Sequence, residues 1–126
     1  VLTSAKDPFY LHSSHRWIER LRKSSPEPVC EIHPETAAAH GILDGDPVSI
    51  ETLHGRIKQK ASITARIKLG VINAAYGWWF PGESKKQLFD WESAGFNMLT
   101  TADKLGKEFG TPNLKGINCR ISKAED

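Results

Sequence analysis

The chain has 126 residues, of which 39% are hydrophobic and 25% charged, which suits one domain with a modest core. Seventeen Lys and Arg against fifteen Asp and Glu give a net charge of only +2, which argues against a bulk nucleic-acid binder and means that any bound anion needs a local site. No stretch approaches the roughly 20 apolar residues of a membrane span, so no direct membrane contact is expected.

The first segment to carry chemistry is "FYLHSSHRW". Phe9 to Leu11 predicts a short strand that runs into a polar and basic cluster, and the following "IERLRKSSPEP" predicts a short helical or irregular stretch ended by prolines. At a strand end, hydroxyls, backbone amides, an imidazole and a guanidinium can converge on a phosphate. The residue types alone leave a solvated polar strand end equally open.

The middle of the chain predicts a strand, a short helix and a hairpin. "PVCEI" is typical of a short strand, and "HPETAAAHGI" predicts a helix with Pro34 in its first turn and Gly41 at a left-handed C-terminal cap. "PVSIET" and the run from 57 to 67 alternate between apolar and polar residues around "LHGR", which indicates an antiparallel hairpin. The second strand places on one face Ile57, Gln59, Ala61, Ile63, Ala65 and Ile67.

A mostly apolar run, "VINAAY", predicts a more deeply buried strand and leads into "YGWWFPG", residues 76 to 82. Three large aromatic side chains in a loop are expected to be buried against something, because an exposed aromatic cluster is unfavourable in water. They could fill the domain's own core, dock onto a neighbouring domain, or flank a planar ligand, and the last two can hold together.

The C-terminal third predicts a helix over "TADKLGKEF", 101–109, and a closing strand, "INCRIS", 117–122. Strands at this spacing favour a small barrel. Asn97 and Lys115 lie in loops where an amide or an ammonium could meet either a ligand or water. Cys30 and Cys119 belong to no CxxC pair and are interpreted as two separate buried thiols.

Several signatures of chemistry are absent from the sequence. The usual nucleotide loops, the hydrolase elbow and the zincin helix do not occur. His12 and His15 form HxxH, but no carboxylate or thiol lies close by in sequence to complete a metal site, so no metal ligand and no catalytic residue is assigned.

The order of the motifs carries a resemblance over nearly the whole chain. Its most specific part is "IHPETAAAHGILDGDPVSIETLHGRI", preceded by "LHSSHRW" and followed by "GWWFPG", "NMLT" and "LKGINCRIS". This pattern resembles the molybdopterin-dinucleotide-binding domain that closes the large subunit of molybdenum and tungsten oxidoreductases of the dimethyl sulfoxide reductase family. The last segments are most similar to the branch with acetylene hydratase and formate-dehydrogenase-like subunits.

The resemblance implies a mainly β fold with short helices, a double-psi β-barrel of the aspartate decarboxylase type. Residues 1–126 would form one such domain, as a fragment or the C-terminal domain of a larger subunit whose upstream domains are its partners. The implied cofactor is molybdopterin guanine dinucleotide, with molybdenum or tungsten held mainly by the other domains. This domain would bind the cofactor and perform no catalysis alone.

The resemblance also implies which residues touch the cofactor. The cluster after the first strand would contact the pterin or its phosphates, Asn97 matches a later contact position, and Lys115 is a weaker candidate near the last one. Trp79 would lie nearest the pterin, and in the isolated domain the rings of the loop would face water. The predicted cofactor-binding residues are His12, Ser13, Ser14, His15, Arg16, Trp79, Asn97 and Lys115.

Two other functions are compatible with such a barrel. A free-standing domain could act as a protein-interaction module, which would need the aromatic loop but not the polar cluster, and Arg16→Ala would then spare it. A self-processing aspartate decarboxylase needs a Gly-Ser bond to generate its pyruvoyl group. The chain contains no Gly-Ser dipeptide, so this second alternative is set aside.

Overall fold

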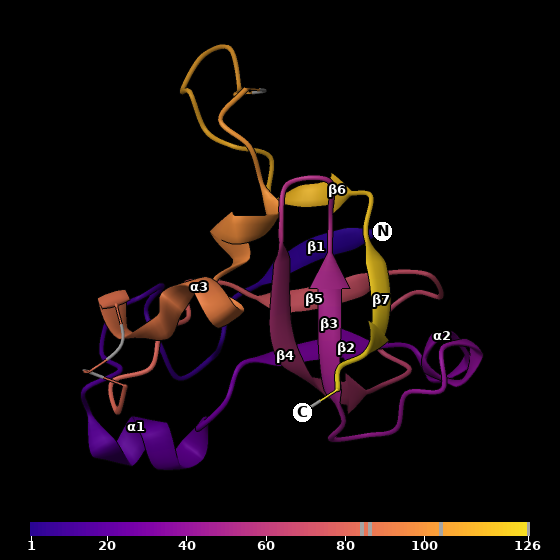
Figure 1. The fold of residues 1–126 in the computed structure, drawn as a ribbon, viewed down its shortest axis with the longest axis horizontal. Coiled ribbons are helices and arrows are strands. Elements are labelled where there is room, and N and C mark those ends of the chain that lie inside the picture. Colours follow the sequence, from indigo (N-terminus) through magenta and orange to yellow (C-terminus); the bar gives the residue numbers. More distant parts are fainter. Residues whose placement is uncertain (84, 86, 104, 126) are drawn as a thin grey trace.

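Seven short strands form one mixed sheet in the computed structural model, which describes residues 1–83, 85, 87–103 and 105–125. Their order is β6-β1-β5-β2-β4-β3-β7 (Figure 1). The strands are β1 Leu2–Ala5, β2 Val29–Ile32, β3 Pro47–Glu51, β4 Arg56–Ile63, β5 Ile72–Ala75, β6 Lys115–Ile117 and β7 Arg120–Lys123.

The two outermost strands are also consecutive in the chain. Only Asn118 and Cys119 separate β6 from β7, so the sheet must curl until its two edges approach each other. Within the sheet, β1 runs parallel to β5 and β2 runs parallel to β4, while the other neighbours are antiparallel. The predicted mainly β, barrel-like fold with short helices is therefore confirmed.

Short helices lie at the ends of this sheet. The α-helices are α1 Glu19–Ser24, α2 Pro34–Ala39 and α3 Trp91–Ala94, and the 3-10 turns are η1 Gln87–Asp90 and η2 Phe96–Leu99. The predicted helix α2 begins where His33 Nδ1 accepts the N–H of Glu35 and ends before Gly41, whose φ of +64° is left-handed as expected. In Figure 1, α1 and α3 lie on one side of the sheet and α2 on the other.

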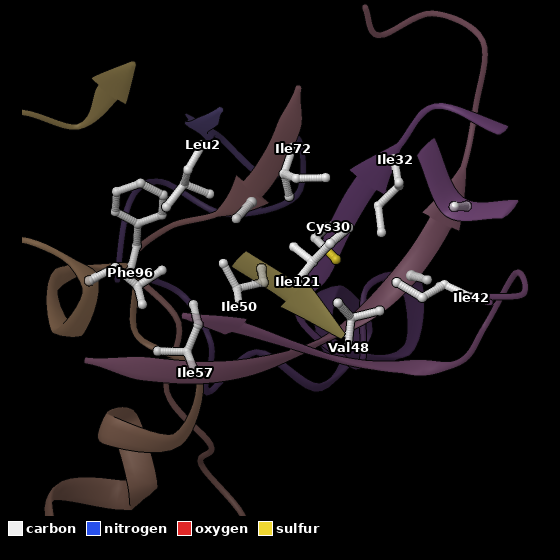
Figure 2. Packing of buried hydrophobic residues seen from close by; sticks show 14 residues of the cluster. Leu2, Cys30, Ile32, Ile42, Val48, Ile50, Ile57, Ile72, Phe96 and Ile121 are labelled. Atoms are coloured by element: carbon white, nitrogen blue, oxygen red, sulfur yellow. The ribbon is translucent and has the colours of Figure 1, made fainter. Parts of the chain in front are cut away.

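The core lies inside the curved sheet and is mostly aliphatic (Figure 2). Alternation along β4 buries Ile57, Gln59 and Ala61 and leaves Lys58 and Lys60 exposed, as the period of two predicted. Each buried strand contributes to this cluster, whose larger members include Leu2, Ile32, Val48, Ile50, Ile57, Ile72, Phe96, Leu99 and Ile121.

Two predicted elements near the N-terminal half are wrong in position. The first strand is β1, and residues 9–11 instead follow a turn in which Asp7 Oδ1 accepts the N–H of Phe9. The hairpin is present, but its second strand ends at Ile63 rather than Ile67. Its parallel neighbour β2 ends at the paired residue Ile32, so the chain beyond Ile63 has no strand to pair with.

Two further predictions fail near the C-terminus. The described part of 101–109 holds no helix, because the chain forms a hairpin-like loop with a bridge between Leu105 and Pro112 and a left-handed Gly110. The closing strand is two strands, since β6 pairs with β1 and β7 pairs with β3. No helix in the described part of the chain is long and apolar enough to cross a membrane.

Candidate functional site

One pocket of about 340 Å³ lies where three loop segments meet, and we call it the aromatic pocket. The turn after residue 12 and the aromatic loop supply part of its lining, and the segment 88–97 supplies the rest. The lining combines aromatic rings with small and polar residues. The lining residues are Ser13, Gly77, Trp78, Trp79, Leu88, Phe89, Trp91, Gly95, Phe96 and Asn97.

Arg16 is buried, with 1% of its surface exposed, against Gly77 and Trp78, which line this pocket. Its Nε and Nη2 donate to the carbonyl of Gly77 at 3.0 and 2.9 Å. The guanidinium lies between the rings of Tyr10 and Trp78, 4.1 and 4.0 Å from their centroids. Burial lowers the pKa of the guanidinium from its usual value, and the nearby Tyr10 opposes this shift. Arg16 therefore fastens the aromatic loop to the turn formed by residues 12–16.

The aromatic loop and the 12–16 turn touch at Gly77. Gly77 has a φ of +70°, and a Cβ there would lie 2.9 Å from the carbonyl carbon of His12. Only glycine combines this left-handed backbone with so close an approach. The carbonyl of Gly77 is thereby aimed at Arg16, and the two segments form one wall.

The two tryptophans of the loop have different surroundings. Trp78 is 4% exposed and packs edge-on against Tyr10, with ring centroids 5.6 Å apart. Trp79 is half-buried, its Nε1 donates to the carbonyl of Ser13 at 2.6 Å, and its ring packs against Trp17 and Phe89. Trp78 thus fills the domain's own core, contrary to the expectation that the loop's rings face water. Trp79 lines the pocket.

The other residues of the polar cluster are exposed. His12 Nδ1 lies 2.9 Å from the Tyr76 hydroxyl, with a hydrogen bond whose direction depends on the tautomer. The N–H of Ser14 donates to the carbonyl of Leu11, and the carbonyl of His15 accepts the N–H of Ile18. These residues form the rim of the turn beside the pocket.

Asn97 and Lys115 lie in different places. Asn97 stands in η2 with an exposed side chain at the edge of the aromatic pocket. Lys115 lies on β6, where its Nζ donates to the carbonyl of Ser4 at 3.2 Å, and it does not line the pocket. The structure therefore brings together Ser13, Trp79 and Asn97 above Arg16, and the role of Lys115 stays a prediction.

Several residues that line or support this site were not among the predicted ones, including Phe89, Trp91 and Gln59. Phe89 and Trp91 lie in "QLFDWES", which has no periodicity that would place them on one wall. The sequence did indicate that Gln59 has a structural role, because a polar side chain on the apolar face of an alternating strand needs a buried hydrogen-bond partner. Its amide reaches the backbone of Ala75 and Ala94.

The cysteines are free and lie away from this pocket. Burial raises the pKa of the Cys30 thiol to about 12 and also raises that of the half-buried Cys119. The pair agrees with the interpretation of two separate thiols. Among the residues that the structure describes, no three His, Cys, Asp or Glu side chains gather to hold a metal ion.

Comparison with known proteins places this geometry in a family. Residues 1–118 match the model of the molydopterin dinucleotide binding domain. The chain is 38% identical over 122 residues to dopamine dehydroxylase of Eggerthella lenta, covering 97% of this chain and 12% of that protein. It is 32% identical over 101 residues to acetylene hydratase of Syntrophotalea acetylenica, covering 76% of this chain and 14% of the relative.

A solved structure agrees with the sequence matches. Acetylene hydratase from Pelobacter acetylenicus superimposes with a TM-score of 0.90 and 27% identity, over 98% of this chain and 18% of that one. The chain thus spans less than a fifth of the length of these relatives. The matches support molybdopterin guanine dinucleotide as its cofactor, and they show that the chain belongs to the molydopterin dinucleotide binding domain family of molybdenum and tungsten oxidoreductases.

Proposed function

We propose that this chain is the C-terminal domain of a larger oxidoreductase subunit and that its aromatic pocket holds part of the molybdopterin guanine dinucleotide, without catalysis of its own. The observation that carries the proposal is the convergence of Ser13, Trp79 and Asn97 on one pocket from segments far apart in the chain. The small share of each relative that the chain covers supports its place within a larger subunit.

The residues present fit a flat, polar heterocycle. Trp79, Phe89 and Trp91 offer ring surfaces, while Ser13 and Asn97 offer a hydroxyl and an amide at the edge. Beneath the wall, Arg16 Nη1 and Trp78 Nε1 are buried donors without a hydrogen-bond partner among the described residues. Unpaired buried donors are costly, and of these two residues Trp78 lines the pocket whereas Arg16 does not.

The size of the pocket limits what it can hold. A volume of about 340 Å³ is at the low end of the roughly 300 to 1,000 Å³ typical of small-molecule sites. A pterin joined through a diphosphate to a nucleoside is longer than such a pocket. One end of the cofactor would lie here, and the rest would lie against the upstream domains.

The roles of the chain's own residues follow from this placement. The rings exclude water from one face of the bound group, and Asn97 and Ser13 fix its orientation through hydrogen bonds at the rim. When bound, the cofactor would supply the metal-centred chemistry of the parent enzyme. Arg16 contributes by holding the aromatic loop, because its guanidinium is already engaged with Gly77.

The burial of Arg16 changes how the interaction-module alternative is tested. Arg16→Ala would loosen the aromatic loop itself and so would impair a protein-docking surface as well as a cofactor site. A discriminating substitution must be exposed and must leave the loop intact. Asn97 meets both conditions, since its side chain is exposed and no described hydrogen bond uses its amide.

We therefore test the site with Asn97→Asp in the full-length subunit. The carboxylate keeps the shape of the amide but removes its donors and places a negative charge beside an anionic cofactor. We expect the guanine nucleotide and metal recovered per purified subunit to fall about tenfold, the effect of roughly 1.4 kcal/mol of binding free energy. Nucleotide released by acid is measured by chromatography, and the metal by mass spectrometry.

Asn118→Asp is the matched control, because Asn118 is an exposed asparagine on the connection between β6 and β7 and lines a different hollow. It makes the same change of charge and should retain the cofactor. If Asn97→Asp retains as much nucleotide and metal as Asn118→Asp, the aromatic pocket is not the cofactor site. An interaction module would show that result and would also keep its protein partner, because Asn97→Asp leaves the aromatic loop intact.

A further inference from the structure

Gln59 is a buried polar side chain whose hydrogen bonds all go to the backbone of other segments. It lies on β4 with 3% of its surface exposed, on the same face as the aliphatic core. Its Nε2 donates to the carbonyls of Ala75 and Ala94 at 2.8 and 3.1 Å, and its Oε1 accepts the N–H of Ala75 at 3.0 Å. Both amide hydrogens and the amide oxygen are thus engaged.

The two partners of Gln59 stand where the walls of the aromatic pocket begin. Ala75 ends β5 and is followed directly by the aromatic loop. Ala94 ends α3 and is followed by Gly95, Phe96 and Asn97, which also line the pocket. The side chain of Gln59 therefore joins the starting points, Ala75 and Ala94, of two segments that line the pocket.

The backbone groups of Ala75 and Ala94 that face Gln59 lie beyond the ends of the regular elements that would otherwise pair with them. The ladder between β5 and β2 ends at Ala74, so the N–H and carbonyl of Ala75 lie beyond the register of β2. Ala94 is the last residue of α3, so no N–H within the helix can donate to its carbonyl. Gln59 bonds the N–H and carbonyl of Ala75 as a neighbouring strand would, and it bonds the carbonyl of Ala94 as a capping side chain would.

A second link closes the walls at their other end. The N–H of Phe80 donates to the carbonyl of Phe89 at 2.9 Å, beyond the tryptophans. Gln59 thus joins the two lining segments at Ala75 and Ala94, and this backbone bond joins them again between Phe80 and Phe89. A shift of either segment would change the separation of Trp79 from Asn97, because these two lining residues follow Ala75 and Ala94, the two positions that Gln59 joins.

We propose that Gln59 is a positioning residue that fixes the separation of the two walls of the aromatic pocket and thereby sets how well the pocket retains its ligand. The retention part of this inference rests on the proposed function. Gln59 touches neither the pocket nor its rim, so it acts only through the backbone of Ala75 and Ala94.

The test replaces the amide by an apolar side chain of similar length, Gln59→Met, in the full-length subunit. Three backbone groups then lose their buried partner. We expect amide hydrogen exchange in peptides covering 76–80 and 95–99 to accelerate by about 10-fold to 100-fold, with exchange in 29–32 unchanged. Guanine nucleotide recovered per subunit should fall by about tenfold, in parallel with the exchange.

Ile57→Val is the matched control, because Ile57 is equally buried two residues earlier on the same face of β4 and makes no polar link. It should leave exchange in both wall segments and the nucleotide content unchanged. Protection of Cys30 from alkylation shows that each variant is folded. Should Gln59→Met fail this check, Gln59→Asn replaces it, since the shorter amide cannot span both partners.

The outcomes separate the two proposals. Unchanged exchange in the wall segments of a folded Gln59 variant overturns the positioning role, whatever the nucleotide content. Accelerated exchange with full nucleotide content overturns the link to retention, and Asn97→Asp then decides whether the pocket is the cofactor site. Accelerated exchange with lost nucleotide supports the inference, provided that Ile57→Val shows neither.

Discussion

The interior of the sheet and the aromatic pocket are built on different principles. Inside the sheet, strands pair with strands and aliphatic side chains fill the space, so backbone polar groups are satisfied by ladders (Figure 2). Around the pocket the chain is mostly loop, and single buried polar side chains, Arg16 and Gln59, take the place of a ladder. The buried donors Arg16 Nη1 and Trp78 Nε1, for which the described part of the chain offers no hydrogen-bond partner, also belong to this region, and Trp78 lines the pocket itself.

This difference indicates where the molecule tolerates change. A core of many similar contacts loses stability in small steps when one side chain is trimmed. A wall held by one guanidinium or one amide loses its arrangement when that group is removed. Substitutions in the two regions should therefore differ in the size of their effect and in how locally it is felt.

The largest expected effect is that of Arg16→Met. The substitution removes the donors to Gly77 and the cation between Tyr10 and Trp78 and leaves a buried carbonyl unpaired. We expect the free energy of unfolding of the 126-residue chain to fall by about 3 kcal/mol, since hydrogen bonds from a charged group and cation–π contacts each contribute about 1 to 3 kcal/mol. Urea titration followed by tryptophan fluorescence measures it.

Arg20→Met is the control for that substitution. Arg20 is exposed on α1, and the same change there should alter the free energy of unfolding by about 0.5 kcal/mol or less. Equal losses in the two variants would mean that the guanidinium of Arg16 does not hold the loop. In Arg16→Met, Cys30 should stay protected from alkylation below the transition, because the sheet interior does not depend on the pocket.

Elements with a strong local pattern could be predicted from the sequence. The alternation of apolar and polar residues along β3 and β4 predicted which of their side chains face the core. Proline at the start, alanines inside and glycine after the end predicted the position of α2. The ends of β4 could not be predicted, because the length of its partner β2 decides them. The strand expected at 9–11 competed with a turn capped by Asp7, and side-chain capping is not visible in an apolar pattern.

The site was predictable in its parts and not in its arrangement. The sequence placed Ser13, Trp79 and Asn97 in a site through the resemblance, and the structure sets them around one pocket. It did not indicate that Arg16 is buried, because a guanidinium in a polar cluster suits an exposed anion site equally well. Nor could it pair Gln59 with Ala94, 35 positions away and in a segment without periodicity.

A substitution in the sheet interior should have a smaller and more evenly spread effect. Ile50→Val removes one methyl group from a fully buried side chain of β3. We expect a loss of about 1 kcal/mol, with an unchanged dependence of the unfolding free energy on urea. Cofactor content of the full-length subunit should not change. A fall in nucleotide content matching that of Gln59→Met would contradict the separation of the two regions.

The smallest expected effect lies at the turn that precedes β3, in a surface ion pair. The N–H of Leu43 and then Lys123 hold the pKa of the Asp46 carboxyl below its usual value. A carboxyl whose pKa is lower in the folded chain stabilises it above about pH 4 and loses this contribution as the pH falls through the folded pKa. Asp46→Asn should therefore be less stable than the parent chain at pH 7, by a margin that closes at lower pH. In a Lys123→Met background, Asp46→Asn should cause a smaller loss of stability at pH 7. Urea titrations at a series of pH values measure these differences in unfolding free energy. A difference between Asp46→Asn and the parent chain that does not change with pH would show that the carboxylate is not its cause.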